Sequence, residues 1–145
     1  MKVILLVIAI LVLPITLSSN NSYSNYAIIK AYRWDKMYNA LCVIESNNNT
    51  RAVNHVSNAV GIIQIRPIYI KEVNRIQQRV KYTLKDRFIA KKCREMFDIF
   101  QNYYNFEHSI NKAIILHISG HRNFINNNIP YWYLNRVKSE MNNNK

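Results

Sequence analysis

Apolar residues recur at steps of three and four along most of this chain, and that spacing is the feature that most limits its fold. No stretch alternates apolar and polar residues as a half-buried strand does. The sequence therefore predicts a mostly α domain with little or no sheet. Helices are expected over 26–46, 68–79, 84–104, 111–119 and 130–141, with a short helix or turn over 58–65.

The first residues have the pattern of a secretory signal. Lys2 precedes an apolar run over 3–13, and small residues follow at 16–19. The pattern predicts a signal peptide. An uncleaved membrane anchor is the second choice, because the apolar run is shorter than the roughly 20 residues that span a bilayer. We expect a secreted, periplasmic or cell-envelope protein. The 145 residues suit one domain and divide into a signal peptide at 1–19, a polar spacer at 20–25, a domain at 26–141 and a frayed tail at 142–145.

The chain is strongly basic, with a formal net charge of +12 whose residues are spread along its length. Such a charge favours attraction to an anionic surface, of which bacterial cell wall and nucleic acid are both examples. The export signal and the lack of a groove-reading motif argue against nucleic acid as a partner. The two cysteines, Cys42 and Cys93, leave open either one disulfide or two buried thiols.

Glu45 is the first candidate for chemistry. It closes an apolar, helix-like run that contains Tyr38, Leu41, Cys42 and Ile44, and an Asn-rich loop follows it. The negative end of the helix dipole and apolar neighbours both disfavour an ionised carboxylate. We therefore expect Glu45 to stay protonated near neutral pH, as a general acid must. The alternative is a solvated residue at a helix end.

The segment after Glu45 adds a glycine and a lone amide. Gly61 and Gly120 are the only glycines, so each is expected to serve a positive φ or a close approach. Gln64 is the only polar side chain in the isoleucine-rich segment 62–65. An amide without a hydrogen-bond partner there costs roughly 1–3 kcal/mol. The partner of Gln64 is either the backbone or a bound ligand.

Glu45 has no carboxylate neighbour shortly downstream. No aspartate or glutamate occurs over 46–71, whereas glycosidases that use two carboxyls place them within about 5–10 Å of each other. Remote partners remain open, namely Asp35, Glu72 and Asp86. A mechanism with a single carboxylate fits this pattern better.

The two motifs together resemble a known family. Glu45-Ser46, followed by the segment over 57–67, is similar to the motifs of lytic transglycosylases of the soluble-transglycosylase and goose-type-lysozyme class. The matching positions are Glu45, Ser46, Ser57, Ala59, Gly61, Gln64 and Pro67. The resemblance covers about residues 30–140 in motif order. It implies a lysozyme-like helical domain with a cleft.

Two later motifs of that family are matched only in part. Its Ala-Tyr-Asn-x-Gly motif aligns with 116–120, where Gly120 is kept, His117 replaces the tyrosine and Ile118 replaces the asparagine. Its tyrosine four residues before a valine in the last helix matches Tyr133 and Val137. Because an isoleucine side chain forms no hydrogen bond, the change at Ile118 puts activity or glycan preference in question.

The resemblance implies a secreted peptidoglycan lytic transglycosylase that cleaves the β-1,4 bond between MurNAc and GlcNAc. Glu45 protonates the glycosidic oxygen and then, as a base, takes the proton of the muramoyl 6-hydroxyl to close a 1,6-anhydro ring. No cofactor, metal or water is required, and the expected partners of the monomer are glycan strands in the anionic wall. The implied substrate-binding residues are Ser46, Gly61, Gln64, His117, Gly120 and Tyr133.

Three other functions stay open. A muramidase would hydrolyse the same bond with water. A catalytically weak peptidoglycan-binding protein follows from the loss of the family asparagine at Ile118. A nucleic-acid-binding protein follows from charge alone.

Several site residues also have a purely structural alternative. The Ser46 hydroxyl can bond the backbone, and His117 and Tyr133 can belong to the core. His121 is a second histidine that can replace the missing family groups. Tyr131 and Trp132 lie beside Tyr133 in the sequence and are weaker candidates for a face on which sugars stack.

Overall fold

The computed structural model describes residues 20–143, and it confirms a mostly α protein. The elements in order are α1 (Asn20–Ser46), β1 (Val53–Asn54), β2 (Ala59–Val60), α2 (Pro67–Ile76), the 3₁₀ helix η1 (Leu84–Phe88), α3 (Ala90–Tyr104), α4 (Ile110–Ile125) and α5 (Tyr131–Asn143). The predicted signal peptide at 1–19 and the end of the predicted tail at 144–145 lie outside the described residues. Within 20–143, no helix is long and apolar enough to cross a membrane.

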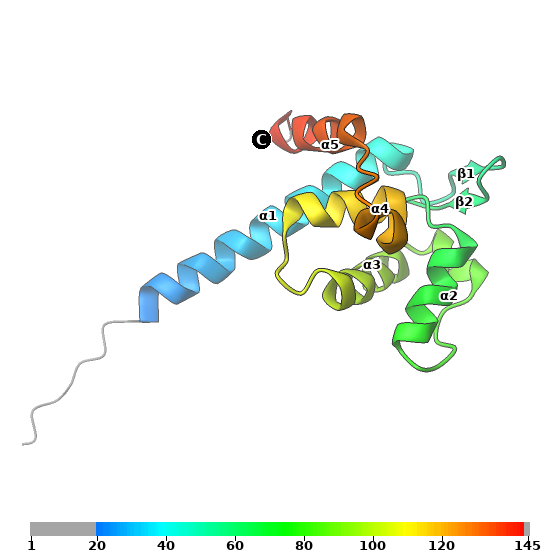
Figure 1. The fold of residues 1–145 in the computed structure, drawn as a ribbon, viewed down its shortest axis with the longest axis horizontal. Helices are drawn as coiled ribbons and strands as arrows, with labels where there is room; N and C mark the ends of the chain where they lie inside the picture. The colour runs from blue at the N-terminus through cyan, green and yellow to red at the C-terminus, as the bar shows by residue number, and fades with distance from the viewer. Residues whose placement is uncertain (1–19, 144–145) are drawn as a thin grey trace, which may run out of the picture.

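The longest helix, α1, supports the rest of the fold. Its C-terminal half lies beside α5 and α4, whereas its N-terminal half extends away from the other helices (Figure 1). Ile28 and Ile29 on that half are exposed. The helix begins at Asn20, so the stretch 20–25, predicted to be a polar spacer, is part of it. That stretch contains no glycine or proline that would interrupt a helix.

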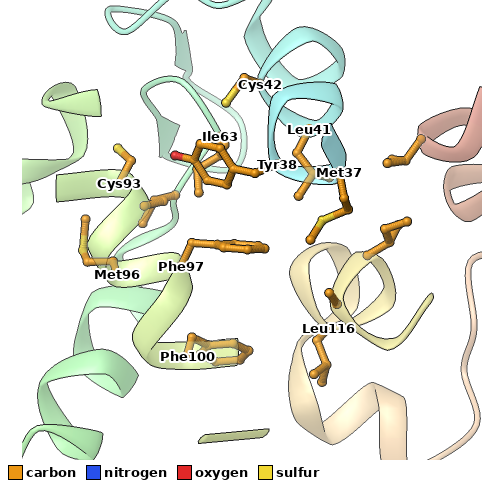
Figure 2. Packing of buried hydrophobic residues seen from close by; sticks show 14 of the residues in the cluster. Met37, Tyr38, Leu41, Cys42, Ile63, Cys93, Met96, Phe97, Phe100 and Leu116 are labelled. Carbon is orange, nitrogen blue, oxygen red and sulfur yellow. The ribbon is translucent and has the colours of Figure 1, made fainter. Parts of the chain in front are cut away.

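One buried apolar cluster joins α1, α3 and α4. Leu41 of α1, Phe97 of α3 and Leu116 of α4 are fully buried and converge in it (Figure 2). Cys42 and Cys93 belong to the same cluster, and both are free thiols. The question left open by the sequence is therefore answered in favour of two buried thiols.

The predicted continuous helix over 84–104 is wrong, because the chain breaks at Ile89. Ile89 is extended, with φ −108° and ψ 107°, and it separates η1 from α3. Thr83 and Asp86 begin η1 with a reciprocal capping box. The guanidinium of Arg87 is buried and donates to the carbonyl oxygens of Asn58 at 2.8 Å and Ile65 at 3.1 Å. The break thus lets Arg87 hold the segment that follows β1.

That segment is a small hairpin: of the short helix or turn predicted over 58–65, the turn is present at 61–64 and the helix is not. β2 pairs antiparallel with β1, and a tight turn over 61–64 then brings Ile65 back to bridge Val60. Gly61 has φ +85°, and a Cβ built on it would lie 1.8 Å from the carbonyl oxygen of Arg87. The glycine therefore meets both expected needs, a positive φ and a close approach.

The second glycine divides α4 (Ile110–Ile125) at a kink, so the first helical piece ends at Ser119, as predicted. Gly120 has φ 74° and ψ 168°, a combination that is essentially restricted to glycine. After the kink the helix continues for one more turn to Ile125. A Cβ on Gly120 would contact nothing within 4 Å, so the need for glycine here is conformational.

The ends of α2 and α5 lie within three residues of their predicted positions.

Candidate functional site

Glu45 lies in the last turn of α1, and its side chain is 15% exposed. It lines a cavity of about 210 Å³. The hairpin supplies one wall of this cavity and α4 supplies another. The other lining residues are Asn54, Ser57, Ala59, Gln64, Arg66, His117 and Ile118. The predicted acid and the predicted amide, Gln64, thus share one cavity.

Two side chains from other helices contact the Glu45 carboxylate. The hydroxyl of Tyr133, a buried residue of α5, donates a hydrogen bond to Glu45 Oε1. His117 Nε2, from α4, lies 3.6 Å from the same oxygen. Because α1, α4 and α5 pack together, groups far apart in the sequence meet at this carboxylate. Burial and the neighbouring carboxylate raise the pKa of Tyr133, which keeps its hydroxyl protonated as a donor.

The pKa of Glu45 moves in the opposite direction from the one predicted. Burial raises it, but the nearby imidazole of His117, the hydrogen bond of Tyr133 and the charge of Arg136 together lower it below its ordinary value. The expectation from helix end and apolar neighbours considered only desolvation and dipole. It is wrong because two polar side chains reach the carboxylate from α4 and α5. In the free protein Glu45 favours the charged form.

The side chain of His117 is largely buried beside Glu45. Its side chain is 6% exposed, and its ring stands edge-on to Phe97 at 6.1 Å and 61°. The buried Nδ1 has no hydrogen-bond partner within the described part of the chain. His117, at the position where the resembled family has a tyrosine, therefore lies beside the Glu45 carboxylate.

Gln64 has its amide nitrogen tied to the backbone. Nε2 donates to the carbonyl oxygen of Gly61 at 3.0 Å and lies 3.4 Å from that of Ala52. The residue adopts a positive φ of 49° at the end of the tight turn. The backbone alternative thus accounts for the donors, whereas the carbonyl oxygen of the side chain remains an acceptor for a ligand.

Ser46 and Gly61 contact the protein backbone near the site, and neither lines the cavity. The Ser46 hydroxyl donates to the carbonyl oxygen of Ile62 at 2.8 Å, which joins the end of α1 to the turn. Gly61 is buried against Arg87, so the close approach that it permits is to protein backbone. The resemblance had implied an approach to the sugar instead. Both residues position the site without facing it.

A second, larger cavity of about 520 Å³ adjoins the first, because Gln64, Arg66 and His117 line both. Gly120 and His121 line the second cavity. Arg66 Nη2 donates to the carbonyl oxygen of Ile118 at 3.2 Å and so crosses from the hairpin side to α4. Sequence reasoning gave Arg66 no role, although it lies within the second family-like motif.

Of the three remote carboxylates, only Glu72 lies near the site, and it lines the larger cavity. Asp35 forms an ion pair with Arg94 at 2.8 Å, and Asp86 caps η1. Glu45 is the only carboxylate among the described residues that line its own cavity. Within 20–143 no cluster of three His, Cys, Asp or Glu side chains is arranged to hold a metal.

The aromatic residues at the start of α5 are exposed and line neither of these two cavities. Trp132 stands edge-on to Tyr133 at 5.6 Å, and Tyr131 precedes it. A role for this pair in stacking against sugars stays a prediction.

Comparison with known proteins adds no family assignment. The chain matches no protein-family model, no curated protein and no solved structure.

Proposed function

We propose that this protein is a peptidoglycan lytic transglycosylase that uses Glu45 as its single acid and base. The observation that carries the proposal is the isolation of Glu45 as a carboxylate, with Tyr133 and His117 on one of its oxygens, in a cavity lined by no other described carboxyl group. The motif order around Glu45 and Gln64 supports the same class of enzyme.

The acid step requires the neutral form of Glu45, which the contacts around the carboxylate disfavour in the free protein. Burial acts in the opposite direction and raises the pKa of Glu45. A sugar that fills the cavity removes further water from the carboxylate, and desolvation favours the neutral carboxyl group. Substrate binding therefore favours protonated Glu45, which passes its proton to the glycosidic oxygen.

The base step uses the form of Glu45 that its surroundings favour. After losing its proton to the leaving sugar, Glu45 is a carboxylate again, and the hydrogen bond from Tyr133 stabilises that charge. The acetamido oxygen of the substrate stabilises the positive charge at the anomeric carbon. Glu45 then accepts the proton of the muramoyl 6-hydroxyl as the anhydro ring closes. The side-chain carbonyl of Gln64 is an acceptor for the acetamido N–H.

The test is digestion of purified peptidoglycan followed by mass analysis of the soluble products. The wild type is expected to release 1,6-anhydro products, each lighter by one water than the hydrolytic product. Glu45→Gln should lower the rate of release by about 10²–10⁴-fold, as expected for loss of a general acid and base. Glu107→Gln is the matched control, because Glu107 pairs with Lys112 on the surface.

Unchanged solubilisation by Glu45→Gln would contradict the role of Glu45. Products with reducing ends, lost in the same variant, would instead identify a muramidase. Binding of peptidoglycan without release of products would favour the wall-binding alternative, which the apolar Ile118 in the cavity wall motivates.

A further inference from the structure

The larger cavity has a charged wall that the proposed reaction does not use. It is bounded by α2, the end of α3 and the kinked part of α4, and its charged or titratable lining residues include Arg66, Glu72, His121 and Arg122. Its volume of about 520 Å³ falls within the roughly 300–1,000 Å³ of small-molecule sites. The cavity is therefore large enough for a substituent that extends from a sugar in the Glu45 cavity.

The negative charge of Glu72, the carboxylate of this wall, is already balanced by a neighbouring arginine. Arg75 donates to it from Nη2 at 2.6 Å and from Nε at 3.0 Å. The hydroxyl of Tyr104 donates to the same carboxylate. These partners, Arg75 first, lower the pKa of Glu72 despite partial burial. Glu72 thus stays charged and paired, and it gives the cavity little attraction for a cation.

The positive charges of the two arginines that line this wall are not balanced by ion pairs. Neither Arg66 nor Arg122 forms an ion pair with any residue in the described range. Arg66 is anchored by its bond to the Ile118 carbonyl oxygen, which holds its guanidinium where the two cavities meet. Guanidinium groups bind carboxylates through paired N–H donors. The free charge of the cavity is therefore positive.

The kink in α4 places a further polar group in this wall. His121 follows Gly120 directly, and its ring stacks on Tyr104 at 4.1 Å with an angle of 26°. Arg122 comes next and lines the same cavity. The basic side of the cavity thus comes from both the hairpin segment and the turn after the kink.

We propose that the larger cavity binds a carboxylate carried by the glycan strand, through Arg66 and Arg122, while the attached sugar lies at Glu45. This inference rests on the proposed function. The carboxylate has two sources in peptidoglycan: the lactyl group, when the stem peptide has been removed, or the stem peptide itself. Because Gln64, Arg66 and His117 line both cavities, one ligand contacts a continuous wall.

The test measures binding by the full chain carrying Glu45→Gln, which prevents turnover. The probes are glycan strands stripped of stem peptides by an amidase, strands that keep their stems, and an uncharged oligomer of N-acetylglucosamine. Adding Arg122→Gln should weaken binding of a carboxylated strand about tenfold, equivalent to 1.4 kcal/mol, and leave the uncharged oligomer unchanged. The strand that shows the loss identifies the source of the carboxylate.

The control variant is Arg79→Gln, which removes the same charge from an exposed position that lines neither cavity. It should leave all three affinities unchanged. Equal losses from Arg122→Gln and Arg79→Gln would show general charge attraction and overturn the carboxylate site. Equal affinity of the parent for charged and uncharged strands would also overturn it. Binding of no glycan would overturn the proposed function as well, whereas wall cleavage by the Glu45→Gln parent would overturn only the proposed mechanism.

Discussion

Substitution of Gly61 by alanine is expected to be among the most destabilising single changes in the site. The new Cβ would lie 1.8 Å from the carbonyl oxygen of Arg87, just over half of the 3.4 Å at which ordinary contacts begin. Because the nearest atom is backbone, no side chain can rotate to relieve the clash. Arg87 cannot move freely either, since its guanidinium is bonded to Asn58 and Ile65.

The energetic cost has two parts. Overpacking of a filled interior costs about 1–3 kcal/mol, and a non-glycine residue held at the φ of +85° costs about 1–3 kcal/mol more. Gly61→Ala should therefore lower the free energy of unfolding by about 2–6 kcal/mol, against a total of roughly 5–15 kcal/mol for a domain. Gly120→Ala is the matched control, since its Cβ meets nothing within 4 Å and only the conformational cost applies.

Urea unfolding followed by far-ultraviolet circular dichroism measures both variants on one scale. Gly61→Ala should unfold at a clearly lower urea concentration than Gly120→Ala, which should itself fall below the wild type by about 1–3 kcal/mol. If Gly61→Ala were as stable as Gly120→Ala, the contact with Arg87 would not be the reason for the glycine. Its role would then return to the approach of a ligand.

Three further results are expected. Tyr133→Phe removes a hydrogen-bond donor from the Glu45 carboxylate, so the pKa of Glu45 should rise. The acidic limb of the pH–rate profile should then move to higher pH, and kcat/KM should fall by roughly tenfold or more. An unchanged profile would contradict the contact. Because its surroundings lower the pKa of Glu45 in the folded protein, the charged form stabilises the fold at pH values above the ordinary glutamate pKa of about 4.3, and that stabilisation is lost as the pH falls through the lower pKa of the folded state. The stability advantage of the wild type over Glu45→Gln, measured by urea unfolding, should therefore shrink as the pH is lowered below that ordinary pKa. Burial raises the pKa of Cys42 and Cys93 to about 11, so both thiols should resist alkylation at neutral pH in the folded protein and react quickly once it is unfolded in urea.

The helices were predictable because their apolar faces recur with helical spacing. Phe97 and Phe100 of α3, for example, are buried as that spacing predicts. The break at Ile89 was not predictable, since it depends on Arg87 reaching carbonyl oxygens of Asn58 and Ile65, which are distant in the sequence. Long-range hydrogen bonds of this kind leave no periodic signal in the chain.

In the site, too, some features were predictable from the sequence and others depended on contacts between distant residues. The resemblance to the transglycosylase motifs was enough to expect Glu45 and Gln64 in one site and to single out Tyr133, and the structure brings these groups together. The direction of the Glu45 pKa was not predictable, because it depends on the distance of His117 from the carboxylate. For Gly61, the sequence indicated a constraint on the backbone, but only the fold identifies Arg87 as its cause.

Glu72 shows by contrast why a carboxylate bonded to tyrosine is not sufficient for proton transfer. It accepts a hydrogen bond from Tyr104, much as Glu45 does from Tyr133. Its strongest partner, however, is Arg75, whose guanidinium stays charged at any working pH. A carboxylate paired with a permanent cation has little tendency to take up a proton.

Glu45 differs because no arginine or lysine forms an ion pair with it among the described residues. Among the partners that lower its pKa, His117 comes first and the permanent charge of Arg136 comes last. Burial acts in the opposite direction and is the largest single influence on that pKa. A substrate that removes more water from the carboxylate strengthens this influence and favours the neutral form. The lowered pKa of Glu45 is therefore compatible with the proposed role as general acid, whereas the shift at Glu72, caused first by Arg75, opposes such a role.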